Sequence, residues 1–278
     1  MLSINVDEVG IDIPEIVDFL TRNHLDSVEL RTLRGINFAN FEEKEIQSLI
    51  ADLDKYKLCV SAVASPLFKW YKSTPEHIQP YDSFNFPCIL TENDKLDAIK
   101  RVTRNTVGVG AKKVRIFTGL NGGVPNPNEA FENDMIGFTV SHMQENGIQA
   151  MFENEPVCQI YKFSDCVKML GKFPNIKLWL DVANFYQVNE RISASDLLEV
   201  LPRVGHVHLK DFLFQGSEIK HVALGEGDIP WSEMLDVLLS RQDLGITYSV
   251  ETHVKEQKIS ATERSIAYFR SKLKHVGS

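Results

Sequence analysis

The sequence has few cysteines and no paired cysteine motif. Only four occur in 278 residues, Cys59, Cys88, Cys158 and Cys166, and none stands in a CxxC arrangement. A disulfide framework or a zinc site of the CxxC kind is therefore not expected. Cys59 and Cys158 lie beside apolar runs, which predicts that both are buried free thiols.

Long apolar runs and an excess of positive charge are also missing. No apolar run approaches the roughly 18 residues of a membrane-spanning helix, and no charged segment followed by an apolar stretch opens the chain. With 30 Lys and Arg against 38 Asp and Glu, the formal net charge is −8, which gives no general attraction for nucleic acid. We therefore expect a cytoplasmic protein with neither a membrane nor a nucleic-acid partner.

Short apolar segments alternate with longer segments of helical spacing. The sequence predicts strands at 2–6, 27–30, 58–65, 113–118, 149–153, 177–181, 206–210 and 247–251. Helices are expected at 14–23, 42–56, 92–109, 128–146, 162–172, 194–201, 231–240 and 261–274. Parallel strands need such crossover helices, no GxGxxG follows the first strand, and no linker-like stretch divides the chain. The pattern predicts a single-domain α/β fold over residues 1–278, a (β/α)8 TIM barrel.

One predicted connection, 66–91, is unusually long. It contains the aromatic residues Phe68, Trp70, Tyr71, Phe84 and Phe86. Long loops in compact domains are usually functional. We expect the loop either to close over a ligand as a lid, with Trp70 as a substrate contact, or to pack its aromatic side chains beneath itself.

Ionisable residues follow or end five of the predicted strands, where barrel enzymes keep their chemistry. They are Glu29 and Arg31, Glu153 and Glu155, Asp181 (with Asn184), His206, His208 and Lys210, and Glu251 and His253. Converging carboxylates repel one another unless a cation neutralises them, and carboxylates with one imidazole suit Mn²⁺, Mg²⁺ or Zn²⁺. We predict that Glu153, Asp181, His208 and Glu251 bind a divalent metal ion. The alternative is that each carboxylate caps a helix or pairs with Lys210 or Arg115.

Five motifs, "FENEP", "LDVAN", "GHVHLKD", "GEGDIPW" and "YSVETH", together resemble the xylose isomerase-like barrel superfamily. This resemblance implies a metal (Mn, Mg, Zn or Co) held by Glu153, Asp181, His208 and Glu251, as in the epimerase branch. It further implies a sugar or sugar phosphate isomerase or epimerase in which Glu153 and Glu251 are the acid/base pair. Such enzymes abstract a proton next to a carbonyl and pass through a metal-stabilised enediolate.

The same resemblance assigns roles to residues near the ligands. His206, Lys210 and Glu155 are expected to contact substrate or to support the ligands, and Asn184 stands where epimerases often have histidine in a "DxxH" motif. Asparagine can hydrogen-bond a substrate but cannot act as an acid or base. Glu29 and Arg31 are expected to form a structural pair at the rim. The glycine-rich loop 119–123 is a weak phosphate signal, and "GEGDIPW" is expected to form a turn that places Trp231 at a helix start.

Three alternatives remain open at this stage. A dehydratase (lyase) of a cyclic polyol or keto acid, such as inosose or dehydroshikimate, would use the same ligands. A non-catalytic sugar-binding barrel would have less reason to keep four buried charges together. Endonuclease IV-like activity is disfavoured by the acidic charge and by the small number of histidines at strand ends. The resemblance implies a small-molecule carbohydrate partner. Relatives often form homo-oligomers, but no patch in this sequence indicates one.

Overall fold

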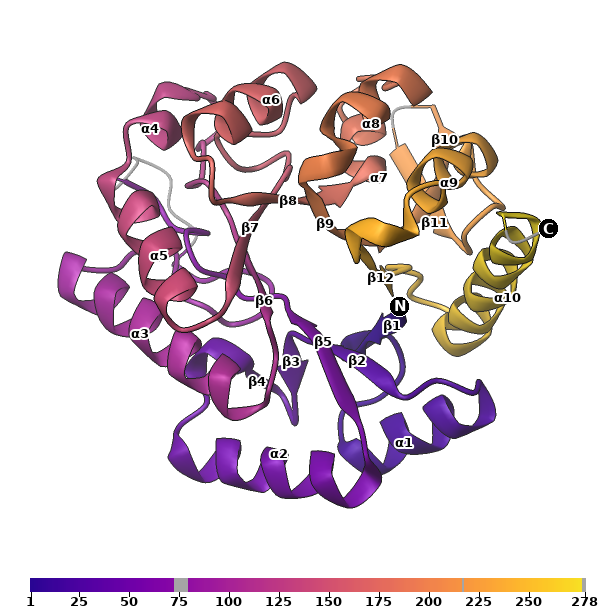
Figure 1. Cartoon of the computed structure of the whole chain (residues 1–278), viewed down its shortest axis with the longest axis horizontal. Helices are drawn as coiled ribbons and strands as arrows, with labels where there is room; N and C mark the ends of the chain where they lie inside the picture. The colour runs from indigo at the N-terminus through magenta and orange to yellow at the C-terminus, as the bar shows by residue number, and fades with distance from the viewer. Residues whose placement is uncertain (73–79, 217, 277–278) are drawn as a thin grey trace.

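Eight parallel strands close into a barrel. The computed structural model describes residues 1–72, 80–216 and 218–276. The strand order is β1–β12–β9–β8–β7–β6–β5–β2, and β1 pairs with both β12 and β2. The strands are β1 (Leu2–Asn5), β2 (Ser27–Leu30), β5 (Cys59–Val63), β6 (Lys113–Ile116), β7 (Gln149–Glu153), β8 (Lys177–Asp181), β9 (Val204–Leu209) and β12 (Thr247–Val250). Helices surround them (Figure 1), so the predicted single-domain (β/α)8 barrel is confirmed.

The helices mostly follow the predicted pattern. They are α1 (Ile13–Arg22), α2 (Glu43–Tyr56), α3 (Glu92–Gly108), α4 (Asn128–Phe131), α5 (Asp134–Glu145), α6 (Phe163–Lys172), α7 (Val182–Gln187), α8 (Ala194–Val200), α9 (Trp231–Leu239) and α10 (Lys258–Val276). The single helix predicted over 128–146 is wrong, because Asn133 caps a new helix, α5, by accepting from the backbone N–H of Met135. Helix α7 was not predicted. It begins directly after β8, where the Asp181 side chain accepts from the backbone N–H of Asn184.

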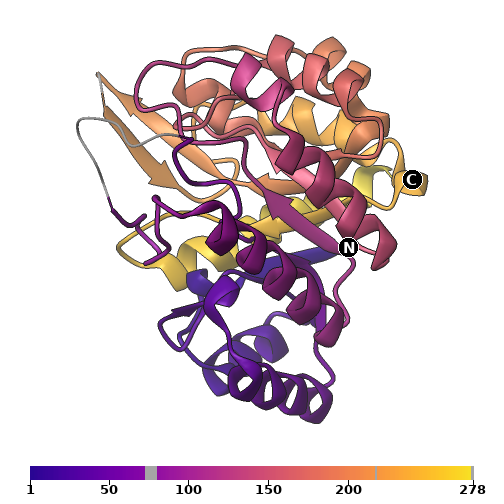
Figure 2. The same cartoon turned by 90° about the vertical axis from the view of Figure 1, so that its left-hand side faces the viewer.

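Two short hairpins were also not predicted. Strands β3 (Thr32–Leu33) and β4 (Ile36–Asn37) form one hairpin, and β10 (Asp211–Gln215) pairs with β11 (Glu218–Val222) in the other. Figure 2 shows β10 and β11 at one end of the molecule and the amino terminus at the other. The β10–β11 hairpin therefore lies at the end of the barrel where the parallel strands finish.

The barrel interior is unusually polar. Residues two apart on a strand share a face, and buried polar residues recur at that spacing, as in Ser3 and Asn5, Ser27 and Glu29, His206 and His208, and Ser249 and Glu251. A small apolar cluster of Ala62, Ala64, Met151 and Trp179 is separate from the large core that includes residues of the surrounding helices. Barrel interiors are usually filled by bulky branched side chains, so this one departs from a purely structural core.

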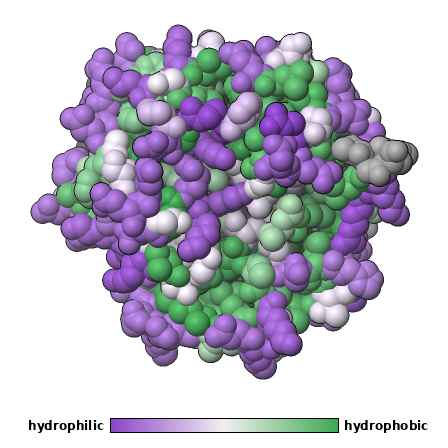
Figure 3. Space-filling model, viewed as in Figure 1, coloured by the Kyte–Doolittle hydropathy of each residue, from purple (hydrophilic) through white to green (hydrophobic). Residues whose placement is uncertain are grey.

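The strand ends that carry the predicted site residues lie away from the opposite face of the molecule. Figure 3 shows this face, from which the amino terminus is seen, with hydrophilic residues over most of its outline and apolar residues gathered in its lower half.

Cys158 is buried as predicted, whereas Cys59 is exposed. The prediction for Cys59 is wrong because it is the first residue of β5, and only the later residues of that strand are covered. Among the described helices, none is long and apolar enough to cross a membrane.

The "GEGDIPW" segment forms a tight turn around one carboxylate. Asp211 accepts from the backbone N–H groups of Gly225 (2.9 Å) and Gly227 (3.0 Å). Trp231 begins α9, as predicted, and its indole N–H donates to the carbonyl of Lys210 at 3.0 Å. The turn therefore fixes the segment that immediately follows His208.

Replacing Gly227 by alanine is expected to destabilise the fold. A Cβ there would stand 2.1 Å from Asp211 Oδ1 and 2.5 Å from the carbonyl oxygen of Phe212, so backbone as well as side chain must move. We expect Gly227→Ala to lower the free energy of unfolding by about 1–3 kcal/mol in urea denaturation. Gly171→Ala, where nothing lies within 4 Å of the new Cβ, is the control. Equal stability of the two variants would contradict the prediction.

Candidate metal centre and active site

Three of the four predicted metal ligands are carboxylates that surround a ring nitrogen of the fourth, His208. His208 Nδ1 lies 3.0 Å from Glu251 Oε2, 3.2 Å from Glu153 Oε1 and 3.8 Å from Asp181 Oδ2. Glu153 and Asp181 are the last residues of β7 and β8, and Glu251 directly follows β12. Asp181 and His208 are register partners across β8 and β9. The carboxyl ends of these parallel strands therefore bring the four side chains together at one end of the barrel, and all four are buried.

His208 Nδ1 is suited to hold a cation. It is buried and makes no hydrogen bond, although carboxylate oxygens surround it. The other ring nitrogen, Nε2, lies 3.1 Å from Glu29 Oε1. A metal-binding histidine commonly donates its second N–H to a carboxylate, which leaves the first nitrogen's lone pair for the ion. Glu153, Asp181 and His208 also offer ligand atoms that all lie within 4.8 Å of one another.

Charges around His208 favour either a proton or a metal at Nδ1. Burial lowers the pKa of His208, but Glu251 and Glu29 outweigh it and hold this pKa well above its ordinary value. Because a metal ion needs the unprotonated nitrogen, its binding would release a proton. A proton and a divalent cation therefore compete for the same atom.

The alternative charge pairs are present as well. Arg115 Nη1 lies 2.9 Å from Glu153 Oε2, Lys210 Nζ lies 2.6 Å from Asp181 Oδ2, and Arg31 pairs with Glu251. The connected group consists of five carboxylates and three cations, namely Asp7, Glu29, Glu153, Asp181 and Glu251 with Arg31, Arg115 and Lys210. With all eight ionised and the histidines neutral, its net charge is minus two. A divalent cation would balance that charge, so the ion pairs and a metal are compatible.

Glu29 and Arg31 do not form the expected rim pair. Glu29 is fully buried and accepts from Asn5 Nδ2 at 2.8 Å, with His206 Nε2 2.7 Å away. Arg31 instead reaches Glu251 and Asp7. The prediction is wrong because Arg31 lies beyond the end of β2 and extends across the mouth, whereas Glu29 stays one level deeper in the barrel.

His206 lies beneath the candidate metal centre. Its Nδ1 lies 2.6 Å from Thr247 Oγ1, its ring centroid is 3.9 Å from that of Trp179, and it is fully buried. It is the register partner of Trp179, one side-chain level below the Asp181 and His208 pair. This placement agrees with a supporting role for His206, and it does not line the cavity at the barrel mouth.

A cavity of about 200 Å³ opens above the four residues. Glu155 and Lys210 line it together with Glu153 and Glu251. Asn184 does not line it, but its Oδ1 accepts from Lys210 Nζ at 3.0 Å. Asn184 therefore fixes a residue of the cavity wall instead of facing the cavity.

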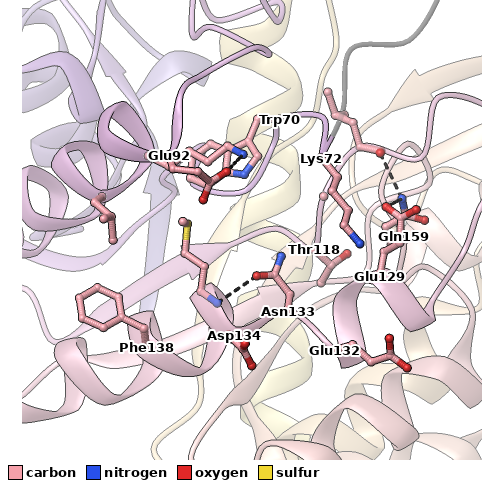
Figure 4. A pocket seen from close by; sticks show the side chains of 15 residues that line it. Trp70, Lys72, Glu92, Thr118, Glu129, Glu132, Asn133, Asp134, Phe138 and Gln159 are labelled. Carbon is pink, nitrogen blue, oxygen red and sulfur yellow. Dashed lines mark hydrogen bonds and ion pairs between the residues drawn. The ribbon is translucent and has the colours of Figure 1, made fainter.

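Trp70 lies outside the mouth, so the substrate contact expected for it is not found there. It is buried against Phe68, with ring centroids 4.9 Å apart, and lines a separate cavity (Figure 4). Its neighbour Lys69 lines the mouth instead, 3.4 Å from Glu155. Sequence reasoning could not choose between the two neighbours, because that choice depends on the path of the loop.

In the described parts of the 66–91 loop, some residues line the mouth and others pack beneath the loop. Phe84 lines the mouth with its ring centroid 4.1 Å from the Arg31 guanidinium, and Asp82 and Ser83 stand beside it. Phe68, Trp70 and Phe86 are buried beneath the loop. Residues 73–79 lie outside the described part of the chain. Opening and closing of this loop as a lid stays a prediction.

The family follows from a match over most of the chain. A model of the xylose isomerase-like TIM barrel family matches residues 17–272. The chain belongs to this family. The resemblance found in the second-half motifs is thereby confirmed, and no curated protein matches the chain by sequence.

Solved structures of this family share the fold at low sequence identity. The probable 3-DHS dehydratase AsbF of Bacillus anthracis has a TM-score of 0.73 and 14% identity, covering 97% of this chain and 98% of its own. The IOLI protein with a bound zinc atom has a TM-score of 0.73 and 16% identity, with coverages of 99% and 97%. D-allulose 3-epimerase of a Methylomonas species, in complex with D-allulose, has a TM-score of 0.72 and 13% identity, with coverages of 98% and 96%.

Glu29 is expected to strengthen metal binding through His208. Glu29→Gln removes the charge that orients the His208 ring, so we expect the metal Kd to rise about 10–100-fold. Titration calorimetry of metal-free protein with Zn²⁺ measures this change. Glu226→Gln, which alters an exposed pair with Arg264, is the control. An unchanged Kd for Glu29→Gln would refute the orienting role.

Proposed function

We propose that the protein is a divalent-metal-dependent sugar isomerase or epimerase that transfers a proton at the carbon beside a carbonyl group. One observation carries the proposal. Two buried glutamates, Glu153 and Glu251, lie at the base of a cavity, within 3.2 Å of the same His208 nitrogen, which makes no hydrogen bond. Proton abstraction and return need two such groups. The D-allulose 3-epimerase among the solved structures supports this reaction class.

Glu153, Asp181, His208 and Glu251 would hold the metal. When bound, a divalent ion polarises a carbonyl oxygen as a Lewis acid. Burial raises the pKa of Glu153, but Arg115 and His208 together outweigh it and lower this pKa to about 2. Glu153 is therefore ionised at neutral pH and can accept a proton from substrate carbon, while Glu251, paired with Arg31, stands across His208 to exchange a proton with the same carbon. Lys210 can donate to a substrate oxygen, and Phe84 and Phe117 cover the mouth.

The paired cations at the mouth favour an unphosphorylated sugar. Of the described mouth residues, Arg31, Lys69, Arg115 and Lys210 carry positive charge, and each one contacts a carboxylate. A phosphate would have to break one of these pairs and leave a carboxylate unpaired in a buried site. A neutral hydroxyl can instead hydrogen-bond to the pairs as they stand.

Cytoplasmic location stays a prediction from the sequence.

A dehydratase is the second candidate, and His253 favours it. His253 Nε2 lies 3.4 Å from Glu251 Oε2, and its side chain is 37% exposed at the mouth. A third proton donor is not needed for proton return to carbon, but it could protonate a departing hydroxyl group. The same first step, proton removal beside a carbonyl, would then end in loss of water.

Incubation in D₂O separates these functions. Protein loaded with Mn²⁺ is mixed with ketoses, their phosphates, inosose and dehydroshikimate, and the products are followed by NMR and mass spectrometry. An isomerase or epimerase is expected to put deuterium on the carbon next to the carbonyl, and a dehydratase to give a product lighter by one water. If no compound takes up deuterium or loses water, both functions are rejected and the sugar-binding barrel remains.

A further inference from the structure

The cavity at the barrel mouth borders a much larger groove, with which it shares lining residues. The mouth has a volume of about 200 Å³, below the range of about 300–1,000 Å³ that is usual for ligand pockets. The neighbouring groove measures about 1070 Å³, and both are lined by Lys69, Asp82, Ser83 and Glu155. The Lys69–Glu155 ion pair therefore stands where the two spaces join.

The groove is built from the loops that follow β5, β6 and β7 and from residues 188–190, which follow α7. Tyr71 and Tyr161 line it, together with the glycine-rich segment of the loop after β6. A Cβ on Gly122 would stand 3.8 Å from Tyr71 Cε1, so the Tyr71 ring lies over this backbone. Asn121 donates to the carbonyls of Pro156 (3.0 Å) and Cys158 (2.9 Å), which ties the loops after β6 and β7 together. The groove walls are thus fixed by hydrogen bonds.

Most charged groups in the groove are already engaged. Asp82 accepts from the backbone N–H groups of Phe84 and Phe86, Glu190 accepts from that of Phe163, and Glu155 pairs with Lys69. The remaining charged lining residue, Lys162, is exposed, with its ammonium 5.8 Å from the Tyr161 ring centroid. The five charged side chains of the lining sum to minus one. Two aromatic rings among engaged charges suit a neutral, ring-shaped polyol better than a phosphate.

We propose that the substrate carries a second, uncharged sugar ring that occupies this groove while the reacting sugar lies in the mouth. The substrate class is then a glycoside or disaccharide with a free carbonyl group on its reacting unit. Tyr161 and Tyr71 are the specificity-determining residues, because sugar rings bury an apolar face against aromatic side chains. This inference rests on the proposed isomerase or epimerase function.

A second cavity in the described part of the chain does not serve this purpose. It measures about 460 Å³, lies beside α3 and α5, and is lined by Trp70, Glu92 and Phe138 among others (Figure 4). None of its lining residues lines the mouth, and it shares only Leu120 with the groove. Phe138, which is 43% exposed there, supplies a matched aromatic control.

The test compares one reacting unit with and without a second ring. Deuterium uptake from D₂O is measured with Mn²⁺-loaded protein on fructose, fructose 6-phosphate and three disaccharides of fructose with a free carbonyl: isomaltulose, turanose and lactulose. We expect kcat/KM for at least one disaccharide to exceed that for fructose by about tenfold or more, which corresponds to about 1.4 kcal/mol. Fructose 6-phosphate is expected to react more slowly than fructose.

Variants then locate the second ring. Tyr161→Ala is expected to lower kcat/KM for the preferred disaccharide by about tenfold and to leave that for fructose within about twofold. Phe138→Ala is expected to change neither value. Tyr71→Ala provides the same contrast should Tyr161→Ala fail to fold, as judged by its thermal melting.

The outcomes distinguish the two proposals. Fructose reacting as fast as every disaccharide, or a tyrosine variant slowing fructose and disaccharide equally, would overturn the assignment of the groove while leaving the proposed reaction intact. If neither the five compounds nor the wider set of carbonyl compounds takes up deuterium, the proposed function is rejected and this inference with it.

Discussion

Replacing Glu251 by glutamine is expected to lower kcat/KM by about 10²–10⁴-fold, the usual contribution of a general acid or base. Glutamine keeps the size of the side chain but cannot carry a proton between substrate and solvent. The fold should tolerate the change, because Arg31 keeps its contact with Asp7 at 2.6 Å when Glu251 loses its charge. Thermal melting of the variant checks that expectation, and Glu226→Gln is the surface control.

Metal titration separates the acid/base role from a ligand role. Because Glu153, Asp181 and His208 remain, we expect Glu251→Gln to bind Mn²⁺ with only a modest loss of affinity while its turnover at saturating metal stays low. Unchanged turnover would remove Glu251 from the chemistry. Recovery of full turnover at high metal concentration would show that Glu251 acts only as a ligand.

Metal binding is expected to raise the stability of the protein, and His208→Ala is expected to abolish this effect. A metal at about 100 times its Kd adds about 2.7 kcal/mol to the free energy of unfolding. For a protein of this size the melting temperature should rise by about 5 °C. Scanning calorimetry with and without Mn²⁺ measures the shift, and EDTA should reverse it together with turnover.

Two histidine variants give this experiment its controls. His142, on α5, stacks on Phe138 away from the barrel mouth, so His142→Ala should keep the full shift. His206→Ala should keep most of the shift. His206 lies beneath the site, and its Nε2 contacts Glu29, which is not one of the four predicted ligands. Loss of the shift in both His206→Ala and His208→Ala would place the metal in the deeper cluster of Glu29, His206 and His208.

The fold and the level of the candidate site could be predicted from the sequence because both depend on periodicity. Parallel strands in order bring their carboxyl ends together, and residues two apart share a face, which is sufficient to group Asp181 with His208 and Glu153. Their exact partners could not be predicted. Arg31 follows β2 and Glu251 follows β12, and their contact depends on how these two strands flank β1 in the closed sheet.

Residues contributed by loops were the least predictable. The length of the 66–91 loop signalled a role at the mouth, but Lys69 and Phe84 line it, whereas the larger Trp70 points elsewhere. Asn184 was expected to face substrate because of its position after Asp181. It instead lies in the first turn of the unpredicted helix α7, which aims its side chain at Lys210. Local sequence does not specify such directions.

Diffraction from crystals grown with Mn²⁺, recorded at the manganese absorption edge, tests the central claim most directly. The account predicts one anomalous peak in coordination contact with Glu153, Asp181, His208 Nδ1 and Glu251. A protein that binds no manganese there, with these head groups held only by Arg31, Arg115 and Lys210, would contradict it.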